Sequence, residues 1–326
     1  MRRCIQLAKN GLQNVKPNPM VGAVLVCDGR IIGEGYHVRY GKGHAEVNCF
    51  ASVKPSEEHL VCRSTLYVSL EPCAHHGKTP PCADLIVSKG VRRVVVGCID
   101  PFAKVQGQGI QKLRNAGIEV TVGVLEAECL ALNRRFIAVN TLHRPYVLLK
   151  WAETKDGFIG FKTAMEGVEK HEPLQISTAF TRMLTHKLRA ECDAILVGRT
   201  THEEEHPQLN VRAWSGPDPE RIVLSASSPS PAWAFSINNV LHHLHQEGCQ
   251  SLLVEGGART LEGFISHGLW DELRVETAPF AVQAGVKAPA LPRQARFVRQ
   301  EEYGKNVIKW FCNTDPKGLE YEENSQ

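Results

Sequence analysis

Three potential metal ligands and one acid are the most informative residues of this chain. His44 is followed two positions later by Glu46, and Cys73 and Cys82 come further along the sequence. One histidine and two cysteine thiolates are a common donor set for catalytic zinc, which keeps its fourth position for water. Zinc lowers the pKa of that water to about 7, and a nearby carboxyl can carry a proton to a departing amine. The pattern predicts hydrolytic removal of an amine from a nucleobase, with Glu46 as the catalytic residue.

The spacing of the two cysteines differs from the usual deaminase signature. Zinc deaminases typically read H-x-E followed by P-C-x-x-C, whereas eight residues separate Cys73 from Cys82 here. The inserted residues 74–81 include polar groups that could reach a substrate, so the spacing indicates a subclass. Two other interpretations stay open: the cysteines could be ordinary buried thiols, or the group could be a structural zinc site. A structural site usually has four protein ligands and would leave Glu46 without a role.

Composition restricts the classes of protein that this chain can belong to. Its 326 residues are enough for two hydrophobic cores, and a net charge of +3 predicts no general attraction to nucleic acid or to an anionic membrane. The eleven cysteines lack the paired spacing of a disulfide framework, and no apolar run approaches the roughly 18 residues of a membrane span. We therefore expect a soluble, cytoplasmic protein with reduced thiols and a small-molecule substrate.

The elements that must position the ligands alternate between strands and helices in the first half of the chain. Strands are expected over residues 21–26, 65–70, 93–96 and 118–122, and helices over 44–53, 82–89 and 109–116. This alternation predicts an α/β layered domain. His44 and Cys82 begin two of the expected helices, where the partial positive charge of a helix N-terminus favours thiolate over thiol.

A second domain with the same alternation is expected after His143. The predicted division is residues 1–143, 144–313 and a polar tail over 314–326. Expected strands cover residues 146–151, 194–197, 221–224 and 251–254, and expected helices cover 178–190, 238–246 and 258–267. The turn Glu255-Gly256-Gly257 follows a buried-strand pattern and precedes a helix, which would suit a cofactor phosphate, although a Gly-Gly pair is more often only a turn.

Several longer segments together resemble one family, the bifunctional riboflavin-biosynthesis deaminase/reductases. The matching segments are residues 16–22 (KPNPMVG), 44–46, 65–82, 144–150, 156–157, 194–198, 207–212 and 255–257. The resemblance implies a cytidine-deaminase-like three-layer α/β domain followed by a dihydrofolate-reductase-like α/β domain. It also implies two consecutive reactions on one phosphorylated pyrimidine: deamination at C2, which requires Zn²⁺, and reduction of the ribosyl group to ribityl by NADPH.

The same resemblance implies roles for individual residues. Those implied to line the deaminase pocket and bind substrate are Asn18, His37, His75 and Lys78. Those implied to bind substrate in the reductase are Arg189, Leu209, Arg212 and Glu255. Those implied to bind NADPH are Ala152, Ser177, Thr201, Glu205, Gly256 and Gly257. Arginine suits bidentate contact with phosphate, although most arginines are solvated surface groups. A homo-oligomer is left open, and no nucleic-acid or membrane partner is expected.

Three departures from the family pattern fall in the second domain. Thr154-Lys155 stands where the family reads Ser-Leu, Glu205 stands where it reads Asp, and Ser225-Ala226 stands where it reads Asp-Ser. We hypothesise that they change the affinity for NADPH. The alternative is a deaminase whose reductase-like domain is degenerate and non-catalytic. A nucleoside or transfer-RNA deaminase is a third hypothesis, which leaves the second domain unexplained and lacks a basic face.

Overall fold

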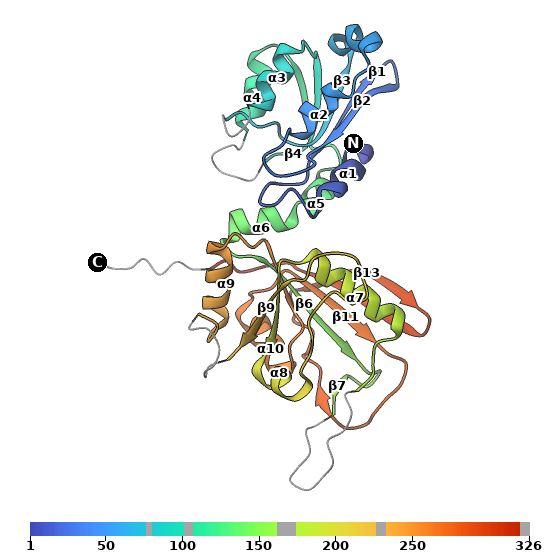
Figure 1. Ribbon diagram of the computed structural model, residues 1–326, viewed down its shortest axis with the longest axis vertical. Helices are drawn as coiled ribbons and strands as arrows, with labels where there is room; N and C mark the ends of the chain where they lie inside the picture. The colour runs from blue at the N-terminus through green and yellow to red at the C-terminus, as the bar shows by residue number, and fades with distance from the viewer. Residues whose placement is uncertain (76–79, 101–106, 162–173, 226–232, 320–326) are drawn as a thin grey trace, which may run out of the picture. The chain divides into compact units, whose positions relative to one another are not determined.

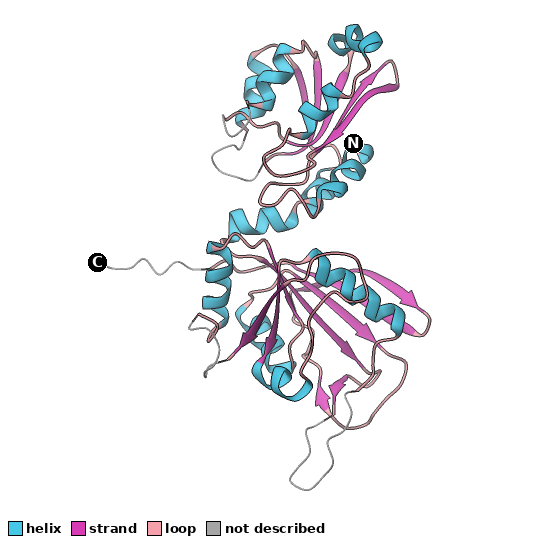
Figure 2. Cartoon of the chain, in the orientation of Figure 1, coloured by secondary structure: helices cyan, strands magenta, loops and turns pink. Residues whose placement is uncertain are grey.

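The computed structural model describes residues 1–75, 80–100, 107–161, 174–225 and 233–319. The chain forms two compact units, Met1–Thr141 and Leu142–Gln326. Each unit has its own sheet with helices packed on it, as the ribbon and the secondary-structure colouring show (Figures 1 and 2). The α/β class expected from the alternating pattern is present in both units.

The first unit is built on a five-stranded sheet in the order β2-β1-β3-β4-β5. Its strands are β1 (Gly22–Cys27), β2 (Arg30–Tyr36), β3 (Thr65–Leu70), β4 (Arg93–Cys98) and β5 (Glu119–Val122). Strands β3, β4 and β5 are parallel, while β1 is antiparallel to β2 and β3. Asp28 and Gly29 both have positive φ, as a tight two-residue hairpin turn requires. The sequence pattern did not reveal β2.

Helices cover both faces of this sheet and make it a three-layer domain. Helices α2 (Ala45–Ala51), α3 (Cys82–Ser88) and α4 (Gln108–Asn115) share one core cluster with the sheet, while α1 (Arg2–Ala8) and α5 (Glu126–Leu132) pack on the other face. Gly35 of β2 lets α2 approach closely, because a Cβ there would lie 2.3 Å from the backbone nitrogen of Cys49. This contact fixes the helix that carries Glu46.

The second unit is built on a seven-stranded sheet in the order β13-β14-β11-β6-β10-β8-β9. Its strands are β6 (Tyr146–Glu153), β8 (Ala194–Gly198), β9 (Glu220–Leu224), β10 (Ser251–Val254), β11 (Glu272–Thr277), β13 (Ala295–Tyr303) and β14 (Asn306–Asn313). The five strands from β11 to β9 are parallel, and the β13–β14 hairpin adds antiparallel pairing at one edge. Strands β7 (Phe158–Gly160) and β12 (Val286–Lys287) form a separate small sheet.

Helices on both faces bury this sheet, which explains why its strands read as continuous apolar runs. Val147 and Leu149 of β6 pack in the cluster with α9 (Ile237–Gln246) and α10 (Ala258–His267). Leu148, between them, points to the opposite face and packs with Leu188 of α7 (Ala179–Glu191). Helix α8 (Arg199–Glu205) follows β8 and contains the unusual run of glutamates.

The first part of the segment expected as a polar tail, residues 314–326, makes hydrogen bonds to the rest of the second unit. The backbone nitrogen of Lys317 donates to the carbonyl of Gly268, and its carbonyl accepts from Nε of Arg144 at 2.6 Å. Arg144 is fully buried, and its guanidinium also binds both carboxylate oxygens of Asp271. Many of these contacts are made by main-chain groups, which the polar side chains of the segment do not reveal. Residues 320–326 lie outside the described part of the chain.

In the described residues, no helix is both long and apolar enough to cross a membrane.

Candidate functional site

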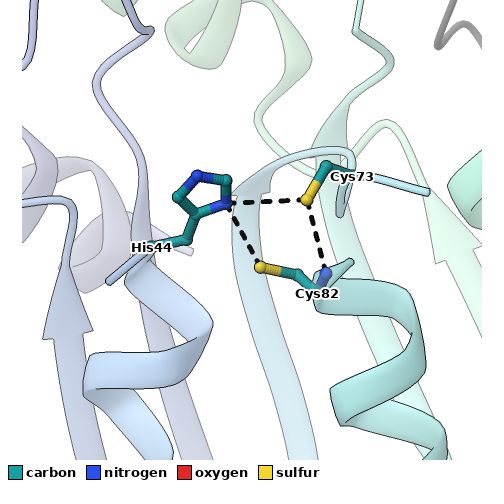
Figure 3. Close-up of side chains that lie close together, drawn as sticks. All are labelled: His44, Cys73 and Cys82. Atoms are coloured by element: carbon teal, nitrogen blue, oxygen red, sulfur yellow. Dashed lines mark hydrogen bonds between the residues drawn. The ribbon is translucent and has the colours of Figure 1, made fainter. Parts of the chain in front are cut away.

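The three predicted metal ligands converge on one point in the first unit. Their ligand atoms all lie within 4.8 Å of one another. Nδ1 of His44 is 3.5 Å from Sγ of Cys73 and 3.3 Å from Sγ of Cys82, and both sulfurs turn toward it (Figure 3). A tetrahedral zinc ion with bonds of about 2.0 Å to nitrogen and about 2.3 Å to sulfur holds its ligands at comparable separations. The donor set and its spacing therefore fit zinc.

Local structure prepares the two sulfurs for a cation. Cys82 is the first residue of α3, and its backbone N–H donates to Sγ of Cys73 at 3.3 Å. Hydrogen bonds from Cys82 lower the pKa of the Cys73 thiol well below its usual value despite burial, and His44 adds to this effect. Among the described residues, this group offers three potential ligand atoms and no fourth. A tetrahedral metal ion held by the three would therefore keep one position open.

That open side faces a cavity of about 360 Å³, which is lined by His44, Cys73 and Glu46 among others. Glu46 lies in the first turn of α2 and is only 3% exposed. Burial, with the neighbouring Cys73 thiolate, raises the pKa of its carboxyl to about 7. A carboxyl with this pKa can both accept and release a proton at neutral pH.

Asn18 and His37 form one hydrogen-bonded chain at the same cavity. Nδ1 of His37 lies 3.1 Å from the carbonyl of Gly43, and its Nε2 lies 3.1 Å from the amide nitrogen of Asn18. A carbonyl only accepts, so Nδ1 carries the proton and Nε2 accepts from Asn18. Burial lowers the pKa of His37 and keeps the ring neutral. The ring also packs edge-on against His44, at 5.2 Å between centroids.

The remaining predicted residues of this pocket differ in how they are placed. His75 lines the cavity with an exposed side chain. Lys78 lies outside the described residues. Sequence reasoning gave no role to Glu71, whose buried carboxylate accepts backbone N–H groups of Gly107, Gly109 and Ile110 at 2.9 to 3.2 Å. Its place directly before Pro72-Cys73 was the available signal. It anchors the start of α4 beside the metal ligands.

A second cavity, of about 300 Å³, lies in the second unit. It brings together all ten residues that the family resemblance assigned to the reductase. They are Ala152, Ser177, Arg189, Thr201, Glu205, Leu209, Arg212, Glu255, Gly256 and Gly257. These residues come from six separate segments of the chain, so their convergence is a property of the tertiary structure.

Opposite charges pair inside this cavity. Nε and Nη2 of Arg189 each lie 2.9 Å from a carboxylate oxygen of Glu255, and Nη1 donates to the carbonyl of Asn210. Nζ of Lys150 lies 3.7 Å from the same carboxylate. Burial alone would raise the pKa of Glu255, but Lys150 and Arg189 hold it at about 2. Lys150 was not predicted as a site residue. The guanidinium of Arg189 is occupied by Glu255, whereas Arg212 is exposed and its Nη1 donates to the side-chain oxygen of Asn210 at 2.8 Å.

The predicted glycine turn closes the other part of this cavity. Gly257 precedes α10, and its N–H donates to Oγ1 of Thr201 at 3.1 Å. A Cβ on Gly256 would lie 2.9 Å from Cβ of Thr260, so the turn has no room for a side chain. Ser177 donates to the buried carboxylate of Glu276 at 2.8 Å.

Comparisons with known proteins agree with this arrangement in both units. The cytidine and deoxycytidylate deaminase zinc-binding region matches residues 1–98, and the RibD C-terminal domain matches residues 145–308. The riboflavin biosynthesis protein RibD of Aquifex aeolicus is 37% identical, over 95% of this chain and 97% of that protein. This chain belongs to the RibD family. Both halves of the predicted fold and the predicted family are confirmed.

Solved structures from the RibD family align along nearly the whole chain. A diaminohydroxyphosphoribosylaminopyrimidine deaminase/5-amino-6-(5-phosphoribosylamino)uracil reductase from Thermotoga maritima is 34% identical, with a TM-score of 0.84 over 96% of this chain and 97% of that one. RibD of Acinetobacter baumannii is 32% identical, with a TM-score of 0.80 over 96% and 97%.

The structure explains one of the departures from the RibD pattern. Lys155 is exposed, so the long cation is not buried where a leucine is usual. Thr154 takes the buried position, and its hydroxyl donates to Asp156 at 2.6 Å. Glu205 is exposed at the end of α8 and lines the cavity. Ser225 is buried, and Ala226 lies outside the described residues. The substitution at Lys155 thus introduces no uncompensated buried charge.

Proposed function

We propose that this chain catalyses two consecutive steps of riboflavin biosynthesis on one phosphorylated pyrimidine. The first unit would remove the C2 amine by hydrolysis, and the second would reduce the ribosyl group to ribityl with NADPH. The observation that carries the proposal is the convergence of His44, Cys73 and Cys82 beside a buried Glu46 in one cavity. The names of the Aquifex and Thermotoga relatives supply the substrate class.

The metal would be held by Nδ1 of His44 and the sulfurs of Cys73 and Cys82. When bound, zinc lowers the pKa of a coordinated water to about 7. Glu46, which has a pKa of about 7 and faces the same cavity, would accept a proton from the attacking water and deliver it to the departing amine. Because the carboxyl of Glu46 is buried, its proton would exchange slowly with bulk solvent between the two transfers.

Asn18 and His37 would hold the pyrimidine edge. With Nε2 of His37 occupied by one N–H of Asn18, the amide oxygen of Asn18 can accept from a ring or exocyclic N–H of the substrate. His37 would act through Asn18 by fixing the amide's orientation. His75 would contact the phosphoribosyl part, since a phosphate needs cationic or polar partners rather than the apolar wall of the cavity. The charge of Lys78 suits the same role.

In the second unit, NADPH would lie along the Gly256-Gly257 turn with Ala152, Ser177, Thr201 and Glu205. When bound, it supplies the hydride, and the protein supplies position and exclusion of water. The start of α10 offers backbone N–H groups to a phosphate, and the absence of side chains at the glycines permits close approach. Leu209, Glu255 and Arg212 would contact the substrate. Arg189 would hold Glu255 in place, and Arg212 would bind the phosphate.

The test is a two-stage product assay on the purified full-length chain. Elemental analysis should find stoichiometric zinc, and ammonia should be released from the diaminopyrimidine substrate without NADPH. NADPH oxidation should begin only after deamination, and should begin at once when the deaminated intermediate is supplied. Ammonia release without any NADPH binding at millimolar concentration would instead support the degenerate-reductase alternative. Turnover of cytidine or RNA in place of the riboflavin precursor would contradict the substrate class.

A further inference from the structure

Helix α6 (Arg134–Leu142) supplies part of the wall of the deaminase cavity, although none of its residues was singled out from the sequence. Phe136 and Asn140 line the cavity together with Asn18 and Glu46. Asn133 directly precedes the helix, and its carbonyl accepts the N–H of Ile137 at 2.9 Å. Phe136 and Asn140 are four residues apart and lie on one face of the helix, which is the face that lines the cavity. Asn133 stands three residues before Phe136, at the start of the helix.

Two hydrogen bonds between Asn133 and Met20 join this wall to the segment that carries Asn18, and we call this pair of bonds the latch. The side chain of Asn133 is only 3% exposed, and it accepts the N–H of Met20 at 2.8 Å while donating to the carbonyl of Met20 at 2.9 Å. The two bonds fix the orientation of the amide, because a flipped amide would put its NH₂ against the N–H of Met20. Residues 113 positions apart are joined in this way. Losing the latch would leave both main-chain groups of Met20 without these partners.

The latch lies close to the groups that would bind the pyrimidine. Met20 is two residues after Asn18, whose amide is fixed by His37. A shift at Asn133 would therefore move two parts of the cavity together: the Asn18 segment and the α6 wall. Neither segment contains a metal ligand, because His44 caps α2, Cys73 follows β3 and Cys82 begins α3. The latch can thus affect substrate binding without removing the zinc site.

Phe136 has the chemistry to contact the face of a heteroaromatic ring. The pyrimidine's edge carries its hydrogen-bonding groups, and these would be met by Asn18 and Glu46. Its two faces need apolar partners, and an aromatic side chain stacks on a base with about 1–3 kcal/mol of favourable energy. Phe136 is half-buried, and its side chain has no polar atom. It can therefore pack against a face of the pyrimidine ring but cannot hydrogen-bond to its edge.

We propose that Phe136 is the surface against which the substrate's pyrimidine ring packs, and that Asn133 is the positioning residue that holds Phe136 at the cavity. The inference rests on the proposed deaminase function. It assigns substrate affinity, rather than proton transfer or metal binding, to α6. Its signature is therefore a change in KM for deamination at constant zinc content.

The experiment uses full-length variants and both reactions of the same chain. Phe136→Ala should raise KM for deamination about 5- to 100-fold with a smaller change in kcat, and Phe136→Tyr should restore most of the affinity. Asn133→Ala should raise KM about 5-fold, and Asn133→Asp, which keeps the acceptor for the Met20 N–H, should lie between it and the wild type. Thr141→Ala, an exposed change on the same helix, is the matched control and should alter neither constant.

Zinc content reports whether the first unit of each variant is folded, and reduction of separately supplied intermediate reports whether the second unit is folded. A structural role alone would lower kcat in proportion to the folded, zinc-loaded fraction and leave KM unchanged; that result at Asn133, or an unchanged KM in Phe136→Ala, would overturn the inference. Should Asn133→Ala not fold, the Asn133→Asp and Phe136 variants still decide it. A wild type that releases no ammonia would refute the proposed function itself, which is a different outcome.

Discussion

The two cavities of this protein are prepared for chemistry in opposite ways. The first gathers an imidazole, two sulfurs and a buried acid around a point that the chain does not fill. The second contains charged groups that already contact one another, because Arg189 and Lys150 both contact Glu255. The donor set of the first site thus calls for a metal ion, whereas the second site pairs charged groups of the chain itself.

This difference predicts different consequences of substitution. Removing a functional group from the deaminase cavity should lower activity. The hydrophobic core beneath the cavity, which includes Leu25 and Leu66, should stay packed. Removing one member of the charge group in the reductase cavity leaves the others buried without compensation, which costs stability. The same kind of mutation should therefore affect activity in one unit and folding in the other.

The largest effect is expected for Cys73→Ser. A serine hydroxyl is a poor zinc ligand, and the pair His44 and Cys82 alone cannot complete a catalytic site. Zinc content should fall toward zero and ammonia release should be lost, while reduction of supplied intermediate continues. Cys62→Ser, at an exposed cysteine away from the cavity, is the control and should keep its zinc. Full zinc content in Cys73→Ser would show that the ligand set is misassigned.

Glu46→Gln should lower kcat for deamination about 10²- to 10⁴-fold while zinc stays bound. The amide matches the carboxyl in size but cannot relay a proton. Zinc analysis and single-turnover ammonia release on the same sample separate the proton relay from metal binding. Glu128→Gln, an exposed change in the same unit, should be silent. Near-wild-type turnover in Glu46→Gln would remove this residue from the mechanism.

Glu255 should make the stability of the second unit depend on pH. Its carboxyl has a pKa of about 2, below its usual 4.5, so its stabilising contribution is complete above about pH 4.5 and is lost as pH falls toward 2. The shift corresponds to at most about 3 kcal/mol. Urea unfolding should show that the wild type's advantage over Glu255→Gln is largest at pH 6 and shrinks steadily on acidification.

Glu262→Gln, at an exposed position of α10, is the matched control and should follow the wild type at every pH. A difference between wild type and Glu255→Gln that is constant from pH 6 to pH 3 would mean that the ion pairs around Glu255 contribute nothing.

A smaller effect is expected for Arg212→Ala. The side chain is exposed, so solvent would screen its contact with a substrate phosphate. Losing this contact should raise KM for the reduction about 10-fold with little loss of stability. Arg293→Ala, also exposed but away from the cavity, should leave KM unchanged. Steady-state kinetics with supplied intermediate provides the measurement. An unchanged KM in Arg212→Ala would move the phosphate site elsewhere.

Local patterns were enough to predict several elements and failed at others. Strand Ser251–Val254 and helix Ala258–His267 were predicted with their observed bounds, because three apolar residues, two glycines and a helical period are all contained in one short segment. Strands β11, β13 and β14 were not predicted. Strand β13 is mostly exposed at the sheet edge, so its sequence lacks a buried pattern. The glutamates before His206 belong to helix α8, whose charges likewise concealed it.

The residues of the candidate sites also fall into those that the sequence predicted and those that it did not. His44, Glu46, Cys73 and Cys82 could be named from residue type and order alone, because donor chemistry is a property of the side chain. Lys150 could not, because its contact with Glu255 joins positions far apart in sequence on neighbouring parallel strands. Asn133 and Phe136 were missed because a helix after the last motif gave no sign that it faces the cavity.

The sequence by itself determined the family, the α/β class and the chemical identity of the groups in both cavities. Only the tertiary structure decided that Glu46 is buried enough to hold its proton near neutral pH, and that Arg189 is engaged by Glu255 while Arg212 is exposed. The physical reason is that a ligand's donor atom is fixed by its residue type, whereas burial and charge neighbours arise from segments that meet only when the chain folds.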